Sequence, residues 1–106
     1  MMGIHEIIFV DYPIGVHDIH PLEPMLRASP NPFYVSTLIQ FSMDAPAYSK
    51  LELWDLNGRK IKSIAEGNFD KGNHELLLDN TGLSAGIYLL KFITSDYLIT
   101  RKLVRQ

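Results

Sequence analysis

The stretch that decides the fold is 50–65, KLELWDLNGRKIKSIA. Before the pair Asn57-Gly58, a strand would carry Leu51 and Leu53 on one face and Trp54 and Leu56 on the other, and 59–65 would be the returning strand. Asn-Gly accepts the positive φ angles of a type I′ turn, which makes it a strong hairpin signal. We therefore predict two antiparallel strands, over 50–56 and 59–65, joined by this turn.

The rest of the chain repeats this pattern of short apolar runs between turn residues, with no window of helical periodicity. Further strands are expected over 24–28, 37–43, 74–79, 87–94 and 97–105. The segments 67–72 and 80–86 are expected to be connections, the second with Leu83 in the core. About seven short strands in roughly 80 residues predict an all-β, Ig-like antiparallel β-sandwich, with a closed barrel as the alternative. The Cys...Trp...Cys pattern of true immunoglobulin domains is absent.

The composition is typical of one globular domain, with 106 residues, 46% of them hydrophobic and 21% charged. Five of the six prolines lie within 11–32, so the chain is expected to be extended and linker-like as far as Pro24. This divides the chain into a linker over 1–23 and a folded domain over 24–106. Because there is no cysteine, a disulfide framework, a thiol nucleophile and a Cys zinc site are excluded.

Charge and hydropathy narrow the range of partners. Ten Lys+Arg against twelve Asp+Glu give a net charge of -2, which does not favour binding to nucleic acid or anionic lipid. The apolar run near the N-terminus is shorter than that of a signal peptide and carries Glu6 in place of a basic flank. No stretch approaches the ~20 apolar residues of a membrane helix. We expect no nucleic-acid partner and no export signal within this chain.

Residues capable of catalysis or metal binding are few. His17 and His20 lie close together with Asp18 between them, but a proline-rich segment provides little of the rigid support that a metal site needs. We interpret both as solvated linker histidines. There is no G-x-S-x-G motif and no glycine-rich phosphate loop, and nothing in the sequence brings Asp55 and Asp79 together. The sequence predicts no catalytic residue, no metal and no cofactor.

Two surface features have competing interpretations. Four aromatic residues could form a platform for a sugar ring, although rings within strand patterns more often fill the core: Tyr48, Trp54, Tyr88 and Tyr97. The last expected strand carries Arg101, Lys102 and Arg105, and we interpret it as a solvated edge strand protected against uncontrolled pairing. A specific homodimer through an edge strand stays open.

Several motifs, read in order, are more specific than any one of them. They are SPNPF at 29–33 followed by Thr37 and Ile39, LWDLNGRKI at 53–61, GNH at 72–74, LSAGIY at 83–88 and KLVR at 102–105. Together they resemble the type A C-terminal sorting domain of proteins exported by the type IX, or Por, secretion system of Bacteroidetes. The resemblance covers about residues 24–106, and the Lys-aliphatic-aliphatic ending supports it.

The resemblance implies two groups of residues. The transport signal is associated with Gly72, Gly86, Lys102, Leu103 and Val104. The fold motifs fall on Asn31, Pro32, Phe33, Asn57, Gly58, Arg59 and Tyr88. In physical terms, 31–33 would cap the first strand with Phe33 in the core, Gly58 and Gly72 would allow tight turns, and Gly86 would permit a close approach.

The function implied by the resemblance is an address, not catalysis. A covalently attached N-terminal cargo reaches the periplasm by its own signal, and the outer-membrane translocon recognises the sorting domain, for example by strand addition at an exposed edge. A sortase-like protease then removes the domain, and the cargo stays at the cell surface or is secreted. On this interpretation 1–23 are the tail of a cargo or linker within a larger precursor, and the extended segment before Met25 is accessible to cleavage.

A different class of function remains as the alternative. The fold and the Gly-x-Tyr strand are also similar to the Ig-like domain of flagellar hook-capping proteins. An accessory Ig-like module, either binding carbohydrate through Trp54 or Tyr48 or serving as a spacer, would fit the same β-sandwich. The Lys102-Leu103-Val104 ending favours the sorting domain over this alternative.

Overall fold

The computed structural model of this chain describes residues 5–8 and 25–106. In these ranges all regular secondary structure is β-strand. The eight strands are β1 (His5–Ile8), β2 (Leu26–Ser29), β3 (Ser36–Met43), β4 (Ala47–Asp55), β5 (Lys60–Phe69), β6 (Gly72–Asp79), β7 (Gly86–Ile93) and β8 (Tyr97–Arg105). The described ranges contain no helix long and apolar enough to cross a lipid bilayer.

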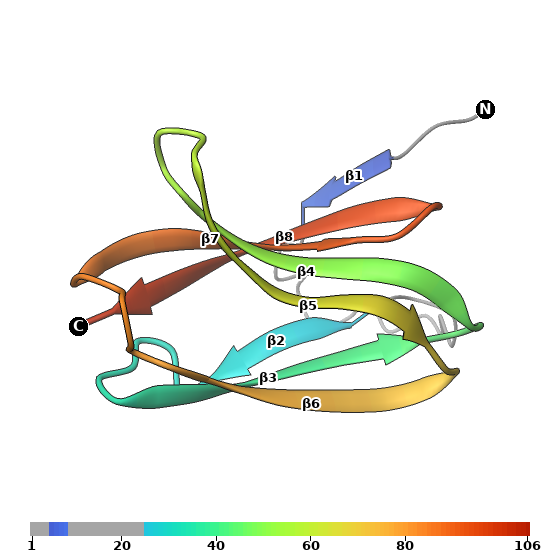
Figure 1. The fold of residues 1–106 in the computed structure, drawn as a ribbon, viewed down its shortest axis with the longest axis horizontal. Coiled ribbons are helices and arrows are strands. Elements are labelled where there is room, and N and C mark those ends of the chain that lie inside the picture. The colour runs from blue at the N-terminus through green and yellow to red at the C-terminus, as the bar shows by residue number, and fades with distance from the viewer. Residues whose placement is uncertain (1–4, 9–24) are drawn as a thin grey trace, which may run out of the picture.

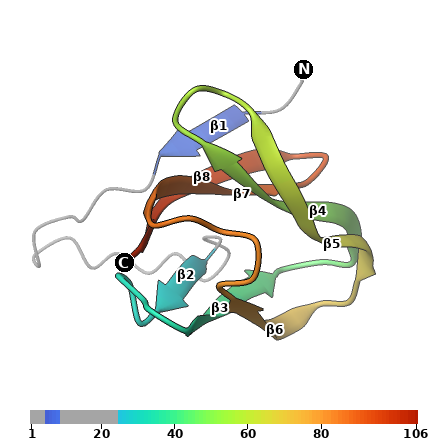
Figure 2. The ribbon, with the colours of Figure 1, turned by 60° about the vertical axis from the view of Figure 1, so that its left-hand side comes forward.

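The strands form two sheets packed face to face (Figures 1 and 2). One sheet has five strands in the order β1-β8-β7-β4-β5, and the other has three in the order β2-β3-β6. Every neighbouring pair is antiparallel except β1 and β8, which run parallel. The predicted all-β sandwich is confirmed, and each of the seven strands expected after residue 23 has a counterpart in β2–β8.

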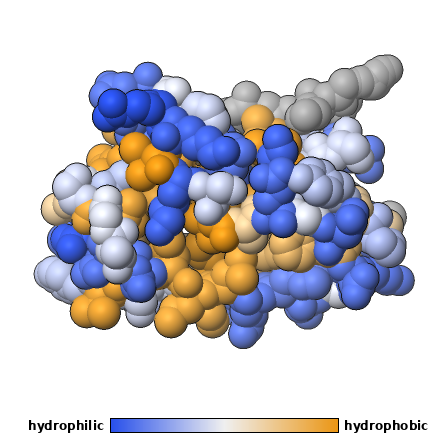
Figure 3. Space-filling view, viewed as in Figure 1, coloured by the Kyte–Doolittle hydropathy of each residue, from blue (hydrophilic) through white to orange (hydrophobic). Residues whose placement is uncertain are grey.

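Strict alternation builds the core between the sheets. Every second residue of β3 is buried, and the inward rows of β4 and β7 face it. Leu83, expected to enter the core from a connection, is 5% exposed. The fully buried apolar side chains are Leu26, Phe33, Ile39, Phe41, Leu51, Leu53, Leu90, Phe92, Ile99 and Leu103. Apolar residues also reach the surface in the lower centre of Figure 3. Leu77 of β6 is 70% exposed.

The β4–β5 hairpin is confirmed, but its turn is not type I′. Such a turn needs positive φ at both central residues, whereas only Gly58 has it, at 87°, and no non-glycine residue in the described ranges does. Gly58 N–H donates to the carbonyl of Asp55, and Asp55 N–H donates to the carbonyl of Arg59. The connection is therefore a three-residue loop with a left-handed glycine at its end, another common hairpin geometry.

The same hairpin is longer at its other end than predicted. We expected 67–72 to be a polar connection, but β5 continues to Phe69 and β6 begins at Gly72. Gly67 and Asn68 stay in the sheet because β4 starts early and lies opposite them, with Ala47 paired to Phe69. Pairing with a neighbouring strand satisfies the backbone of residues whose own preference is for turns.

Strand β8 is not the edge strand that its basic residues suggested. On the side away from β7 it pairs with β1, with His5 opposite Tyr97 and Ile8 opposite Thr100. A strand within 1–23 was not predicted, because its four residues are too short to stand out beside the proline-rich segment. The parallel partner comes from a remote part of the sequence, and local pattern carries no signal for such a pairing.

Candidate recognition surface at the last strand

Two sequence motifs that lie about 70 residues apart meet along β8. The amide group of Asn31 bridges two backbone positions of the strand: Nδ2 donates to the carbonyl of Lys102 at 2.8 Å, and Oδ1 accepts from Val104 N–H at 2.9 Å. Phe33 continues the pairing, because its N–H donates to the carbonyl of Val104 at 2.9 Å and its carbonyl accepts from Gln106 N–H at 2.8 Å. The loop after β2 thus acts as a short neighbouring strand for the end of β8.

Phe33 also anchors this loop in the core. Its side chain is 1% exposed, whereas the next residue, Tyr34, is 67% exposed. The peptide bonds before Pro30 and Pro32 are cis, and both prolines are exposed. The prediction that Phe33 enters the core is confirmed. The clamp on β8 was missed, because nothing in the motif itself points to a partner so far along the chain.

Arg101 ties β8 to the other sheet. It belongs to the inward row of the strand, together with Ile99 and Leu103, and its Nε donates to the carbonyl of Leu26 in β2 at 2.7 Å. The interpretation of Arg101 as part of a solvated basic edge was therefore wrong. A long side chain with a planar charged end can lie along apolar neighbours and still reach a backbone acceptor.

The five signal candidates occupy different environments. Leu103 is 0% exposed and lies opposite Tyr88, whereas Lys102 is exposed and Val104 half-buried. Gly86 begins β7 opposite Arg105, close to the clamped end of β8. Gly72 begins β6 at the end of the sandwich away from the C-terminus (Figure 1). Four of the candidates therefore gather around the end of β8, and Gly72 does not.

Packing requires neither glycine, because a Cβ at either position would meet no atom within 4 Å. Gly72 has φ of +123°, which residues with a Cβ rarely adopt, so a glycine is needed where the chain turns into β6. The prediction that Gly86 permits a close approach was wrong, because a Cβ there would meet no atom within 4 Å.

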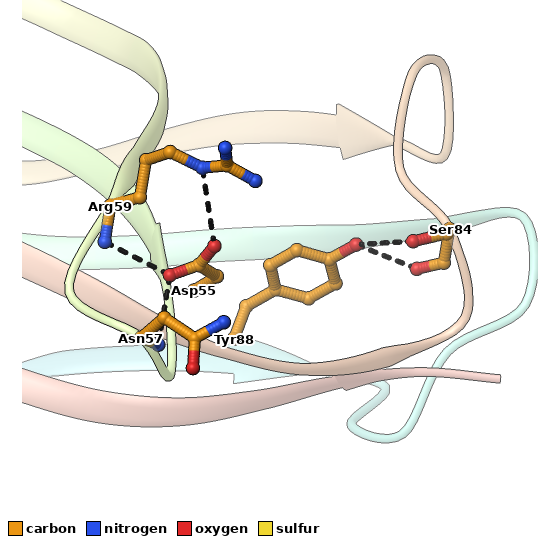
Figure 4. A network of polar contacts seen from close by, with 5 residues as sticks. All are labelled: Asp55, Asn57, Arg59, Ser84 and Tyr88. Carbon is orange, nitrogen blue, oxygen red and sulfur yellow. Dashed lines mark hydrogen bonds and ion pairs between the residues drawn. The ribbon is translucent and has the colours of Figure 1, made fainter.

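Tyr88 holds the loop before β7. Its Oη donates to the carbonyl of Ser84 at 2.7 Å, and the ring is 6% exposed (Figure 4). A buried hydroxyl bonded to the backbone four residues earlier fixes the path of the loop against the core. This is a structural role, consistent with a fold motif.

The carboxylate of Asp55 organises the β4–β5 hairpin. It accepts from the N–H groups of Arg59 and Asn57, both at 2.9 Å, and forms an ion pair with Arg59 Nε at 3.5 Å (Figure 4). The hydrogen bond from Arg59 N–H, assisted by that from Asn57 N–H, lowers the pKa of Asp55. At the end of β6, the N–H of Thr81 likewise lowers the pKa of Asp79. Each carboxylate therefore accepts hydrogen bonds from backbone N–H groups of its own turn.

These two lowered pKa values predict acid sensitivity. A carboxylate whose pKa is lowered on folding stabilises the folded state above its unfolded pKa of about 3.9, and this contribution is lost as the pH falls through the lower folded value. We expect the urea midpoint to fall between about pH 5 and pH 2, and to fall less in the Asp55→Asn/Asp79→Asn double variant. Parallel pH profiles for the two proteins would contradict this assignment.

The aromatic residues considered for a sugar platform do not share one surface. Tyr48 and Trp54 lie on the outward row of β4 but six residues, or about 20 Å, apart. Trp54 is engaged locally: its Nε1 donates to Glu52 at 2.9 Å, and Lys91 Nζ lies 4.4 Å from its ring centroid. Tyr88 and Tyr97 belong to inward rows, where Tyr97 packs edge-on against Phe92.

A buried acid on this outer face was not predicted from the sequence. Glu52 is 5% exposed and also forms an ion pair with Lys60 at 3.2 Å. Burial would raise the pKa of Glu52, but the hydrogen bond from Trp54 and the charge of Lys60 outweigh it and lower the pKa. The residue is a satisfied structural acid of the β4–β5 hairpin.

The two histidines considered as metal ligands belong to the proline-rich part of the sequence. His17 and His20 lie outside the described residues. His74 stacks on Phe41 with ring centroids 5.2 Å apart, and its Nε2 is 2.8 Å from the carbonyl oxygen of Asp70. Residues 5–8 and 25–106 contain no group of three or more His, Cys, Asp or Glu placed to hold a metal ion.

The shared features of this surface define a class of protein. It is a small β-sandwich in which the motifs around 31–33 and 86–88 hold the last strand, and the 102–105 motif forms the end of that strand. Residues 28–106 match the secretion system C-terminal sorting domain, so the chain belongs to this family. Comparisons with curated proteins and with solved structures gave no match.

Membership of this family indicates a C-terminal sorting signal for type IX secretion. Such a domain is attached to a cargo protein, engages the secretion machinery, and implies export to the cell surface or secretion. The family is characterised by sorting and is not known for catalysis, and type IX export fits a Bacteroidetes source.

Proposed function

We propose that residues 24–106 are the address by which an attached cargo crosses the outer membrane from the periplasm, and that the translocon reads the surface around β8. Residues 1–23 are then the linker or cargo tail. The observation that carries the proposal is the convergence of the 29–33 motif on the end of β8, where three hydrogen bonds reach Lys102 and Val104 and a fourth reaches Gln106. Such a clamp holds a chain end, which would otherwise fray, in one geometry that a receptor can read.

The signal candidates divide by exposure. Lys102 offers an exposed charge beside the clamp and is proposed to contact the machinery directly. Leu103 is buried and Gly86 starts the adjacent strand, so both act by keeping β8 in place. Gly72 is remote from this surface and is proposed to act through the fold alone.

Removal of the domain by a sortase-like protease is the next step of the proposed pathway. Cleavage in the segment before Met25 would release the cargo and leave β2–β8 in one chain, because β2 begins at Leu26. After such a cut, β1 and β8 would belong to two different polypeptide chains.

An export assay tests the address. Residues 1–106 are fused behind a signal peptide and a reporter in a type IX-competent bacterium, and compared with the same fusion ending at Arg101 and with Lys102→Glu. We expect surface delivery only of the parent fusion, with both altered fusions retained in the periplasm. Lys71→Glu makes the same charge change at the exposed turn before β6, at the end of the sandwich away from the C-terminus (Figure 1), and is expected to be delivered normally.

Each other outcome is informative. Delivery of the fusion ending at Arg101 would overturn the proposed address. Delivery of Lys102→Glu alongside retention of the truncated fusion would restrict the proposal to the strand backbone. Periplasmic retention of the folded parent would leave the binding-module and spacer alternatives.

A further inference from the structure

The outward edge of β8 is shared by two different partners. The carbonyl of Tyr97 accepts from Thr94 N–H, whereas the N–H and carbonyl of Val104 bond to Asn31 and Phe33. Because backbone direction alternates along a strand, the odd-numbered residues of β8 face β7 and the even-numbered ones face outward. Leu98 and Thr100 therefore present their backbone groups to β1, opposite Glu6 and Ile8.

The two halves of this edge differ in how they are held. The half beyond Arg101 is clamped by Asn31 and by the buried Phe33, both within the family match. The half over 97–100 is covered by β1 alone, which lies before the matched residues 28–106. The sorting domain by itself would thus leave this half-edge unpaired, as a template for an added strand.

We propose that this half-edge is a strand-addition site, and that His5–Ile8 is an exchangeable cap which a strand of the secretion machinery displaces. This rests on the proposed function and names the contact that it requires. The partner is an extended segment that runs parallel to β8, because the resident strand does so.

Exchange is physically reasonable for this strand. It has four residues, and parallel pairing is slightly weaker per residue than antiparallel pairing. Residues 9–25 separate it from β2, so closing this loop costs entropy that offsets its hydrogen bonds. A competing strand therefore needs to overcome only a small net free energy that favours β1 at the edge of β8.

Hydrogen exchange of the purified chain tests displaceability without any secretion system. We expect the amides of Leu98 and Thr100, which face β1, to exchange about tenfold or more faster than those of Ile99 and Arg101, which face β7. These four residues alternate along one strand, so each is a matched control for its neighbour. Equal protection of the two sets would show a permanently bound β1 and would overturn the proposal.

A reversible cross-link tests the role in export. The paired Cα positions of Glu6 and Leu98 belong to adjacent strands about 4.8 Å apart, within the range of a disulfide, and the chain has no other cysteine. Glu6→Cys/Leu98→Cys in a cysteine-free reporter fusion is expected to lower surface delivery about tenfold in the oxidised state, because the machinery can no longer take the edge. Each single-cysteine fusion serves as the control and is expected to be delivered like the parent.

The outcomes separate this proposal from the proposed function. Normal delivery of the cross-linked fusion would overturn the exchangeable cap and leave the address intact, whereas failure of the parent itself would overturn the address. Failure of the two cysteines to cross-link would contradict the pairing on which the cap depends. Folding of the cross-linked protein is checked by its thermal midpoint, which should rise because the bridge restricts the unfolded chain.

Discussion

Replacing Phe33 with alanine is expected to lower the free energy of unfolding by about 3–5 kcal/mol, the usual cost of deleting a buried phenylalanine ring. The ring is 1% exposed and leaves a cavity where the loop after β2 enters the core. Losing this anchor also loosens the Phe33 backbone that pairs with Val104 and Gln106. Equilibrium unfolding in urea measures the change, with hydrogen exchange at Val104 reporting the clamp.

The neighbouring aromatic residue is the matched control for this substitution. Tyr34→Ala removes a side chain of similar size that is 67% exposed, so its effect should stay within about 0.5 kcal/mol. Losses of equal size in the two variants would show that Phe33 does not anchor the loop.

Leu103→Ala is expected to cost about 2–5 kcal/mol, whereas Lys102→Ala, one residue earlier, should cost less than about 0.5 kcal/mol. The leucine is fully buried opposite Tyr88, and the lysine is exposed. Urea midpoints of the two variants measure this difference. The two substitutions distinguish a signal residue that supports the fold, Leu103, from one that offers an exposed side chain, Lys102.

Export of two Leu103 variants checks whether the leucine acts only through the fold. Leu103→Met conserves most of the volume, so it should cost under about 1.5 kcal/mol and keep delivery, while Leu103→Ala should lose both stability and delivery. A stable Leu103→Met fusion that stays in the periplasm would contradict a purely structural role and indicate direct reading of the leucine.

Much of the fold could be predicted because its determinants are local. Alternation over 37–43 and 87–94 predicted β3 and β7 closely, since one buried face imposes a period of two on a strand. The Asn57-Gly58 pair located the hairpin, although not its turn type, because Asp55 captures two N–H groups and favours a longer loop. The motifs near 31–33 and 102–105 were also visible, and their order identified the family.

What the sequence by itself determined is therefore the all-β class, the position of most strands, the burial of Phe33 and the family. Period and turn chemistry are local, within a few residues of chain, and the order of the motifs is read directly along the sequence. The tertiary structure alone decided that Asn31 clamps Lys102 and Val104, that Arg101 turns inward to Leu26, and that β1 covers the edge of β8. Each of these joins residues that are distant in the sequence through backbone groups, and every residue offers almost the same backbone groups. The physical reason is that the folded core selects which backbone groups come within reach of a given side chain or strand, and the identity of the residues that carry those backbone groups gives no signal in the sequence.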